Sequence, residues 1–168
     1  MLQDWIGFEE VFMRLTTRTN LAMRILMVCA VNQNRRLPTI EIADLCNCST
    51  NHAAHVVQRL HSEGHLDAWR GRAGGISLSR PMEQISVGEV FRLFEADIPF
   101  AECYDEKNNN CPLTNNCRLR DYIMRALEAF YHELDMVTLE DLVKGNCGLV
   151  ELLAMHPGKT EVCSAKGP

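Results

Sequence analysis

The chain of 168 residues lacks both a long hydrophobic run and a basic N-terminus. Its longest apolar stretch, Leu21 to Val31, is interrupted by Arg24 and is shorter than the roughly 20 residues of a transmembrane helix. Residues 1–12 contain three acidic residues and neither Lys nor Arg, which is unlike the start of a secretory signal. These absences argue against a membrane protein, and we expect a cytoplasmic location with residues 1–12 as an N-terminal extension.

The sequence also lacks the signatures of several catalytic and metal-binding classes. It shows no recognisable pair of a nucleophile and a general base, and no glycine-rich loop that would cradle a phosphate. No two cysteines have the C-x2-4-C spacing of small structural zinc sites. We therefore expect that the protein is not an enzyme.

Positive charge is scarce overall but concentrated in one part of the chain. The net charge is -5, yet residues 13–80 contain nine Arg and only four acidic residues. Residues 81–168 contain eight basic and fifteen acidic residues. A basic block followed by an acidic block is expected when one part of a protein meets nucleic acid and the other serves sensing or assembly.

Residues 13–80 have the pattern of a helix-turn-helix followed by a two-stranded wing. Apolar residues recur at helical spacing in residues 13–36, in the short segment after Pro38, and over Thr50–Glu63, where Ser49 is a suitable N-cap. After Gly64, the segments HLDAW and ISLSR alternate like two strands around the turn RGRAGG. Two short helices across a tight turn are typical of a DNA-binding helix-turn-helix.

The second helix of this motif offers a polar face, and the wing offers arginines. Asn can pair with adenine and Arg with guanine or phosphate, while an α-helix fits the major groove. Arginines on a wing can enter a narrow minor groove, where the negative potential is enhanced. A solvated polar helix and hairpin are the alternative. The predicted DNA-binding residues are Thr50, Asn51, His52, His55 and Arg59 on the helix and Arg70 and Arg72 on the wing.

Residues 81–144 supply a connecting segment and one long helix. In residues 81–117, Ser86 and Glu89 form an S-x-x-E capping box that opens a short helix, and an irregular stretch follows. In residues 118–144, the run RLRDYIMRALEAFYHELDMV carries an apolar stripe that we expect to pair with its copy in a second subunit. The tail, residues 145–168, shows little pattern and is expected to be mobile. The expected fold is mainly α with a small β-hairpin wing: a winged helix-turn-helix plus a long dimerisation helix.

Eight cysteines are many for a reducing compartment, where metal or redox chemistry is more common than disulfides. Three of them share a polar loop with the spacing Cys103-x7-Cys111-x5-Cys117. Thiolates spread along a loop suit an iron–sulfur cluster, which normally takes four ligands and would here leave one position open. Three thiols without metal are the alternative. Cys29 and Cys46 fall on apolar helix faces, where Cys acts as a small hydrophobic residue.

Several segments resemble one family of regulators. They are MRLTTRTNLAMR, RGRAGGISLSRP, ISVGEVFRLFE, CPLTNNCRLR and AFYHELDMVTLEDLV, and together they span residues 13–143. They are similar to the winged-helix iron-sulfur repressor family that includes NsrR, IscR and RirA, with the loop spacing most similar to the NsrR type. The resemblance implies a DNA-binding homodimer on an operator with an inverted repeat. It further implies a [4Fe-4S] cluster (alternatively [2Fe-2S]) held by Cys103, Cys111 and Cys117, whose nitrosylation by nitric oxide releases the DNA.

One position departs from the NsrR type. NsrR-like proteins can take a fourth cluster ligand from an Asp in the first helix of the opposite subunit, where this chain has Asn20. An amide oxygen is a poorer iron ligand than a carboxylate, and an Asn here is similar to RirA. The alternatives are therefore an iron- or redox-responsive repressor of RirA type and a cluster-free thiol or zinc DNA-binding module. A small electron-transfer protein is disfavoured, because it would have no use for a recognition helix.

Overall fold

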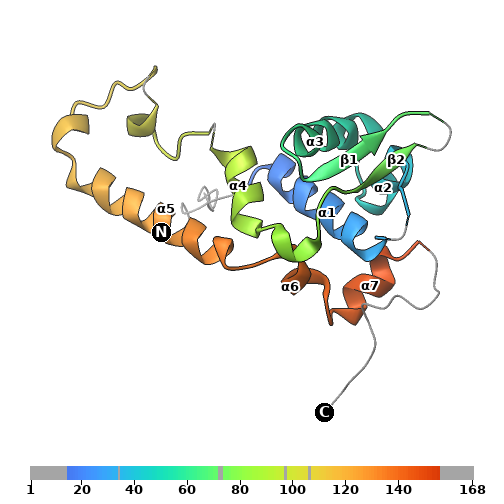
Figure 1. Ribbon diagram of the computed structural model, residues 1–168. Coiled ribbons are helices and arrows are strands. Elements are labelled where there is room, and N and C mark those ends of the chain that lie inside the picture. Colours follow the sequence, from blue (N-terminus) through green and yellow to red (C-terminus); the bar gives the residue numbers. More distant parts are fainter. Residues whose placement is uncertain (1–14, 34, 72–73, 97, 106, 156–168) are drawn as a thin grey trace, which may run out of the picture.

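Helix α1 (Thr17–Val31) is the centre of the fold in the computed structural model, which describes residues 15–33, 35–71, 74–96, 98–105 and 107–155 (Figure 1). Ten of its fifteen residues are buried, because later helices and a hairpin pack around it. The helix begins after Thr16, whose hydroxyl accepts a hydrogen bond from the Thr19 N–H at 3.2 Å. The first predicted helix is thus confirmed, although it is shorter than residues 13–36.

The predicted helix-turn-helix is confirmed in α2 (Thr39–Leu45) and α3 (Thr50–Ser62). The turn between them passes through Asn47, which has a left-handed φ of 48° that Asn tolerates better than most residues. Ser49 caps α3 by accepting a hydrogen bond from the His52 N–H at 3.2 Å. The apolar stripe of α3 is buried and consists of Ala53, Val56, Val57 and Leu60.

The wing is an antiparallel hairpin of β1 (Leu66–Trp69) and β2 (Gly75–Leu78), with Trp69 opposite Gly75. The segment before α2 pairs with β2 through one isolated antiparallel bridge, in which Leu37 and Ile76 exchange backbone hydrogen bonds of 2.8 and 2.9 Å. Ile76 and Leu66 are buried against the helices. The hairpin is therefore fastened to the helical body through one face.

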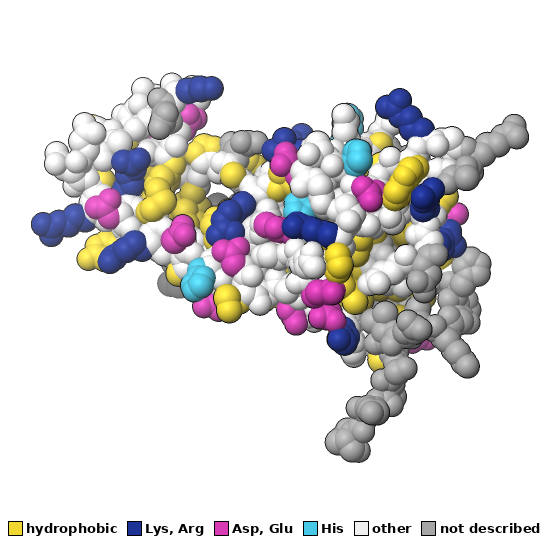
Figure 2. All heavy atoms as spheres, viewed as in Figure 1, with side chains coloured by type: hydrophobic (Ala, Val, Ile, Leu, Met, Phe, Trp, Pro, Cys, Tyr) yellow, Lys and Arg dark blue, Asp and Glu magenta, His cyan; other side chains and the backbone are white. Residues whose placement is uncertain are grey.

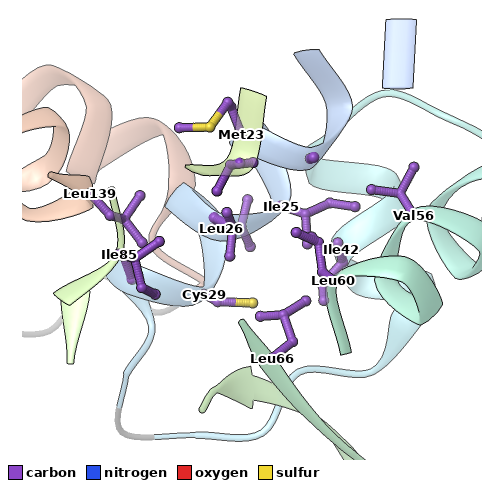
Figure 3. Close-up of a cluster of buried hydrophobic side chains, with 14 of the residues drawn as sticks. Met23, Ile25, Leu26, Cys29, Ile42, Val56, Leu60, Leu66, Ile85 and Leu139 are labelled. Atoms are coloured by element: carbon purple, nitrogen blue, oxygen red, sulfur yellow. The ribbon is translucent and has the colours of Figure 1, made fainter. Parts of the chain in front are cut away.

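The core is formed by side chains that converge on α1 (Figure 3). Ile42 and Leu60 approach from the helix-turn-helix, while Ile85 and Leu139 approach from the other side. Leu139 belongs to α6 (Leu139–Val143), which begins with a capping box formed by Thr138 and Asp141. Full burial of a Leu or Ile side chain contributes about 1.5 to 3 kcal/mol. The core therefore holds the helix-turn-helix and the later helices together as one body.

A long arm, formed by helix α5 (Arg118–Asp135) and the connection that joins it to α4 (Val87–Glu95), projects from this body (Figure 1). Helix α4 starts with the predicted capping box of Ser86 and Glu89, and residues 96–117 then lead to α5. No residue of α5 is buried, and Leu119 is 65% exposed. Among the described helices, none has the length and apolar character needed to cross a membrane. Pairing of α5 with a second copy remains a prediction.

The C-terminal end of α5 is fastened to the N-terminal end of α4. Arg92 forms an ion pair with both carboxylate oxygens of Asp135 and lies 4.8 Å from the centre of the Tyr131 ring. The Val87 N–H donates to the Val137 carbonyl at 2.8 Å. Gly88 allows this close approach, because a Cβ there would lie 2.8 Å from the backbone nitrogen of Asp135. The arm is therefore fixed at one end.

The first part of the expected mobile tail is instead a packed helix, α7 (Cys147–Leu153). Val150 is buried and Leu149 and Leu153 pack against the core. The side-chain amide of Asn32 donates to the Leu153 carbonyl at 2.9 Å, and its oxygen accepts from the Met155 N–H at 3.1 Å. These hydrogen bonds hold the end of α7 against the C-terminal end of α1. Residues 156–168 and 1–14 lie outside the described residues.

Candidate DNA-binding surface and cysteine loop

The face of α3 opposite its buried stripe carries the five predicted DNA-binding side chains. Four of them, Thr50, Asn51, His55 and Arg59, are exposed, and His52 is half-buried. Arg59 lies 3.6 Å from Glu63 in a surface ion pair. The structure thus presents on one surface the donors and acceptors that can contact base edges and phosphates.

An open groove of about 450 Å³ runs beside this face. Apolar side chains of Val56, Leu93 and Phe94 line it, and basic side chains from α1 and α3 surround them. One of these, Arg18, was missed by the sequence analysis. It lies in the first turn of α1, and only the packing of α1 against α3 brings it to the recognition face. The basic residues of the groove are Arg18, His52, His55 and Arg59.

The wing adds further positive charge at the same end of the molecule, where Figure 2 shows Lys and Arg side chains standing out from the surface. Arg70 is exposed at the end of β1, and Arg72 lies outside the described residues. Arg36, also missed by the sequence analysis, lies over the ring of Trp69. The described surface therefore carries cationic side chains on both the helix and the wing.

A buried histidine connects the wing to α4. His65 is 5% exposed, and its Nδ1 lies 2.9 Å from Arg80 and 3.5 Å from Glu89, which also pair with each other. Burial lowers the pKa of His65, although the carboxylate of Glu89 opposes this effect. A neutral ring can accept a hydrogen bond from Arg80 at this nitrogen. This network fixes the base of the wing.

The three loop cysteines occupy different parts of the connection between α4 and α5. Cys103 lies in the short turn Glu102–Tyr104, Cys111 follows a polar stretch, and Cys117 is the N-cap of α5. All three are half-buried and none is in a disulfide. In the part of the chain that the structure describes, no three His, Cys, Asp or Glu side chains lie close enough together to hold one metal ion. The predicted ligands therefore share one loop but are not gathered around a common point.

Glu95 joins the start of this loop to the first turn of α1. Its Oε1 accepts hydrogen bonds from the Thr16 N–H at 2.9 Å, from the Thr16 hydroxyl at 3.0 Å, and from the buried Thr19 hydroxyl. Asn20, the predicted ligand for a partner's cluster, lies in the same turn with an exposed side chain. The first turn of α1 and the end of α4, which precedes the cysteine loop, are thus held together by one carboxylate.

Cys29 and Cys46 are buried and act as small hydrophobic residues, as the sequence predicts. Burial raises the pKa of Cys29 to about 12 and that of Cys46 to about 11. Both side chains are packed in the core. Cys48 is half-buried in the turn of the helix-turn-helix. Neither Cys29 nor Cys46 has the exposure or thiolate character of a metal ligand.

An exposed recognition helix, a basic groove beside it and a hairpin accompanied by Arg36 and Arg70 define a winged-helix DNA-binding protein. The chain belongs to the Rrf2 family, described as iron-dependent transcriptional regulators, whose sequence pattern matches residues 15–145. It is therefore a transcriptional regulator, and its relatives are regulators rather than enzymes.

The similarity to individual relatives covers most of the chain. The chain is 38% identical over 144 residues to the HTH-type transcriptional regulator NsrR of Bacillus subtilis, which covers 85% of this chain and 99% of that protein. It is 41% identical over 142 residues to the HTH-type transcriptional repressor NsrR of Streptomyces coelicolor, covering 83% and 95%.

Solved structures share the fold. IscR of T. potens aligns with a TM-score of 0.62 at 18% identity, covering 86% of this chain and 93% of that chain. CymR, the global cysteine regulator of B. subtilis, aligns with a TM-score of 0.60 at 23% identity, covering 78% and 96%. The expected winged-helix fold is confirmed.

Proposed function

We propose that the protein is a homodimeric repressor that senses nitric oxide through an iron–sulfur cluster and then releases its operator. The observation that carries this proposal is the position of three disulfide-free thiols on the loop between α4 and α5, directly after Glu95. A conformational change in this loop would move Glu95, whose hydrogen bonds to Thr16 and Thr19 hold the first turn of α1. Arg18, which lines the groove beside α3, lies in that turn.

The donor set fits an iron–sulfur cluster in its chemistry. Cys103, Cys111 and Cys117 would supply three thiolates, and Asn20 of a second subunit is the candidate for the remaining position. Cys117 is the N-cap of α5, so a negatively charged cluster bound there would lie at the positive end of the helix dipole. When bound, the cluster supplies iron sites that nitric oxide can attack.

The chain's own residues carry the signal to DNA. Thr16 and Thr19 hold the start of α1 to Glu95, so movement of the loop changes the position of Arg18 relative to α3. Shifting the dimer mostly from the DNA-bound to the free state requires roughly 3 to 5 kcal/mol of difference between the two loop conformations. Several hydrogen bonds and the contact between α1 and α4 can contribute to that difference.

The second subunit is proposed from the exposed stripe of α5. On this stripe Leu119 is 65% exposed, and Ile123 and Leu127 are half-buried and are not among the described side chains that pack against the core. Figure 2 shows apolar side chains over this arm. Pairing two arms would bury them and place two recognition helices on an inverted repeat.

A second candidate signal is iron itself. Asn20 offers a neutral amide where a carboxylate would bind iron more strongly, so a cluster held partly by Asn20 would be lost more readily. Loss of the cluster on iron limitation would then release DNA without nitric oxide.

The test is anaerobic purification with iron and sulfide analysis and a visible spectrum, followed by titration with nitric oxide. Binding is measured on duplex DNA selected by the protein from a random pool. About four iron and four sulfide per chain, with DNA released as nitric oxide bleaches the spectrum, would support the proposal. Release on iron chelation alone supports the iron sensor, and a colourless protein supports the thiol or zinc module.

A pair of variants tests the ligand assignment. Cys111→Ala is expected to lose the cluster but keep the helical content and stability of the apoprotein, because Cys111 lies outside the core. Cys48→Ala is the matched control, since Cys48 is also half-buried and not in a disulfide. Full iron content in Cys111→Ala would contradict the assignment.

A further inference from the structure

Arg36 is held in an unusual position beside the wing. Its guanidinium carbon lies 3.9 Å from the centre of the Trp69 ring, although the two residues are far apart in sequence. Both side chains are exposed, Trp69 by 40%. A stacked, exposed arginine on the rim of a DNA-binding surface raises the question of what its charge contacts.

The stacking of Arg36 on Trp69 depends on Gly75, which is close to both residues in space. Gly75 pairs with Trp69 in the hairpin and has a φ of +150°. A Cβ on Gly75 would lie 2.8 Å from the Cβ of Arg36. Because glycine leaves this space open, the Arg36 side chain crosses β2 and reaches the ring on the neighbouring strand. The backbone bonds between Leu37 and Ile76 hold Arg36 at this level of the wing.

Among the described residues, no carboxylate neutralises the charge of Arg36. Its neighbour Arg35 is held in an ion pair with Glu41, whereas none of the ion pairs among the described residues includes Arg36. Asp67 lies on the same outer face of the hairpin, two residues before Trp69, without an ion pair to Arg36. Arg70 is exposed next to Trp69 at the start of the turn. Arg36 therefore adds a second described arginine to the wing.

We propose that Arg36, stacked on Trp69, binds a phosphate of the DNA backbone beside the wing. This inference rests on the DNA-binding function and adds a residue that the recognition helix and the turn do not include. Guanidinium groups bind phosphate through two parallel hydrogen bonds and can stack on a ring at the same time. Stacking reduces the conformational freedom that Arg36 loses on binding. A phosphate contact of this kind contributes to affinity on any sequence.

The test measures binding to a fluorescein-labelled random-sequence duplex of about 30 base pairs, between about 50 and 200 mM salt. Arg36→Ala is expected to lower the slope of log K against log salt by about 0.9 and to weaken binding about 5- to 10-fold near 100 mM salt. Arg36→Lys keeps the charge and should retain the slope. Trp69→Leu should retain the slope and weaken binding by about 2- to 5-fold, because only the stacking is lost.

Lys144→Ala is the matched control, since it removes the same charge from an exposed position on the far side of the core. The melting temperature of each variant checks that the fold is intact. If Arg36→Ala binds with the slope and affinity of Lys144→Ala, the inference is wrong. If the unmodified protein itself binds the duplex without salt dependence, DNA binding by the proposed surface fails instead. The two failures are therefore distinguishable.

Discussion

Replacement of Gly88 by alanine tests how tightly α4 and α5 must approach each other. Gly88 is the second residue of α4, and an added Cβ would lie 2.8 Å from the backbone nitrogen of Asp135 and closer still to its carboxylate. Real Cβ atoms do not come this close to backbone. The side chain of Asp135 can rotate away, but its backbone can move only if α5 moves with it.

The expected change in the free energy of unfolding of Gly88→Ala is the sum of two opposing contributions. Alanine is favoured over glycine in a helix by up to about 1 kcal/mol. Overpacking costs about 1 to 3 kcal/mol, and here it also stretches the hydrogen bond from Val87 to Val137. We expect a net loss of about 1 to 2 kcal/mol in the free energy of unfolding. That corresponds to a decrease of about 2 to 8 °C in melting temperature for a chain of this size.

The assay is urea denaturation of the apoprotein, followed by circular dichroism at one fixed protein concentration. Gly148→Ala is the control, because Gly148 is also the second residue of its helix and a Cβ there would meet nothing within 4 Å. It should be as stable as the parent or slightly more stable. Adding Asp135→Ala to Gly88→Ala should restore little of the lost stability, since the contact between the new Cβ and the backbone nitrogen of residue 135 remains. A Gly88→Ala protein as stable as the parent would refute the reasoning.

Three further predictions concern single side chains. Ser49→Ala should lower the free energy of unfolding by about 1 kcal/mol, because the hydroxyl caps α3, and an unchanged urea midpoint would contradict this. Burial lowers the pKa of His65 below its ordinary value of 6.5, so the unfolded chain takes up a proton first and stability should fall as the pH drops below 6.5. His65→Gln should reduce that loss in urea titrations at several pH values, and an identical pH profile would oppose the assignment. Cys29 and Cys46, with pKa values of about 12 and about 11, should react with iodoacetamide only on unfolding at about pH 8, as followed by mass spectrometry. Early labelling of Cys29 in the native protein would show that the core opens.

Local signals made most of the fold predictable. Ser49 before an apolar stripe and Gly64 after it fixed the bounds of α3 within one residue. The Ser86–Glu89 capping box placed the start of α4 correctly. Such signals depend on neighbours in sequence, so they can be read without knowing the tertiary structure.

The site was harder to predict, because it depends on contacts between distant segments. Arg18 reaches the recognition face through the packing of α1 on α3, and Arg36 reaches Trp69 across a glycine on another strand. Cysteine spacing identified Cys103 and Cys117 as candidate ligands but gave no distance between them. The missed α7 has a different cause: its seven residues are too short a run to show a helical period, and its stability comes from contacts with the end of α1.

The arm and its cysteine loop form an insertion within a body that closes without them. The chain leaves the body at Ala96, after the last turn of α4, and returns at Asp135, whose backbone lies beside Ser86 and Gly88 at the start of the same helix. The two points are therefore roughly one nine-residue helix apart, about 13 Å at 1.5 Å per residue. The entropy of closing a loop between fixed points grows only slowly with its length. A different sensing segment, longer or shorter and with other ligands, could occupy this gap while the core and DNA-binding surface stayed the same, so the architecture separates what is sensed from what is bound.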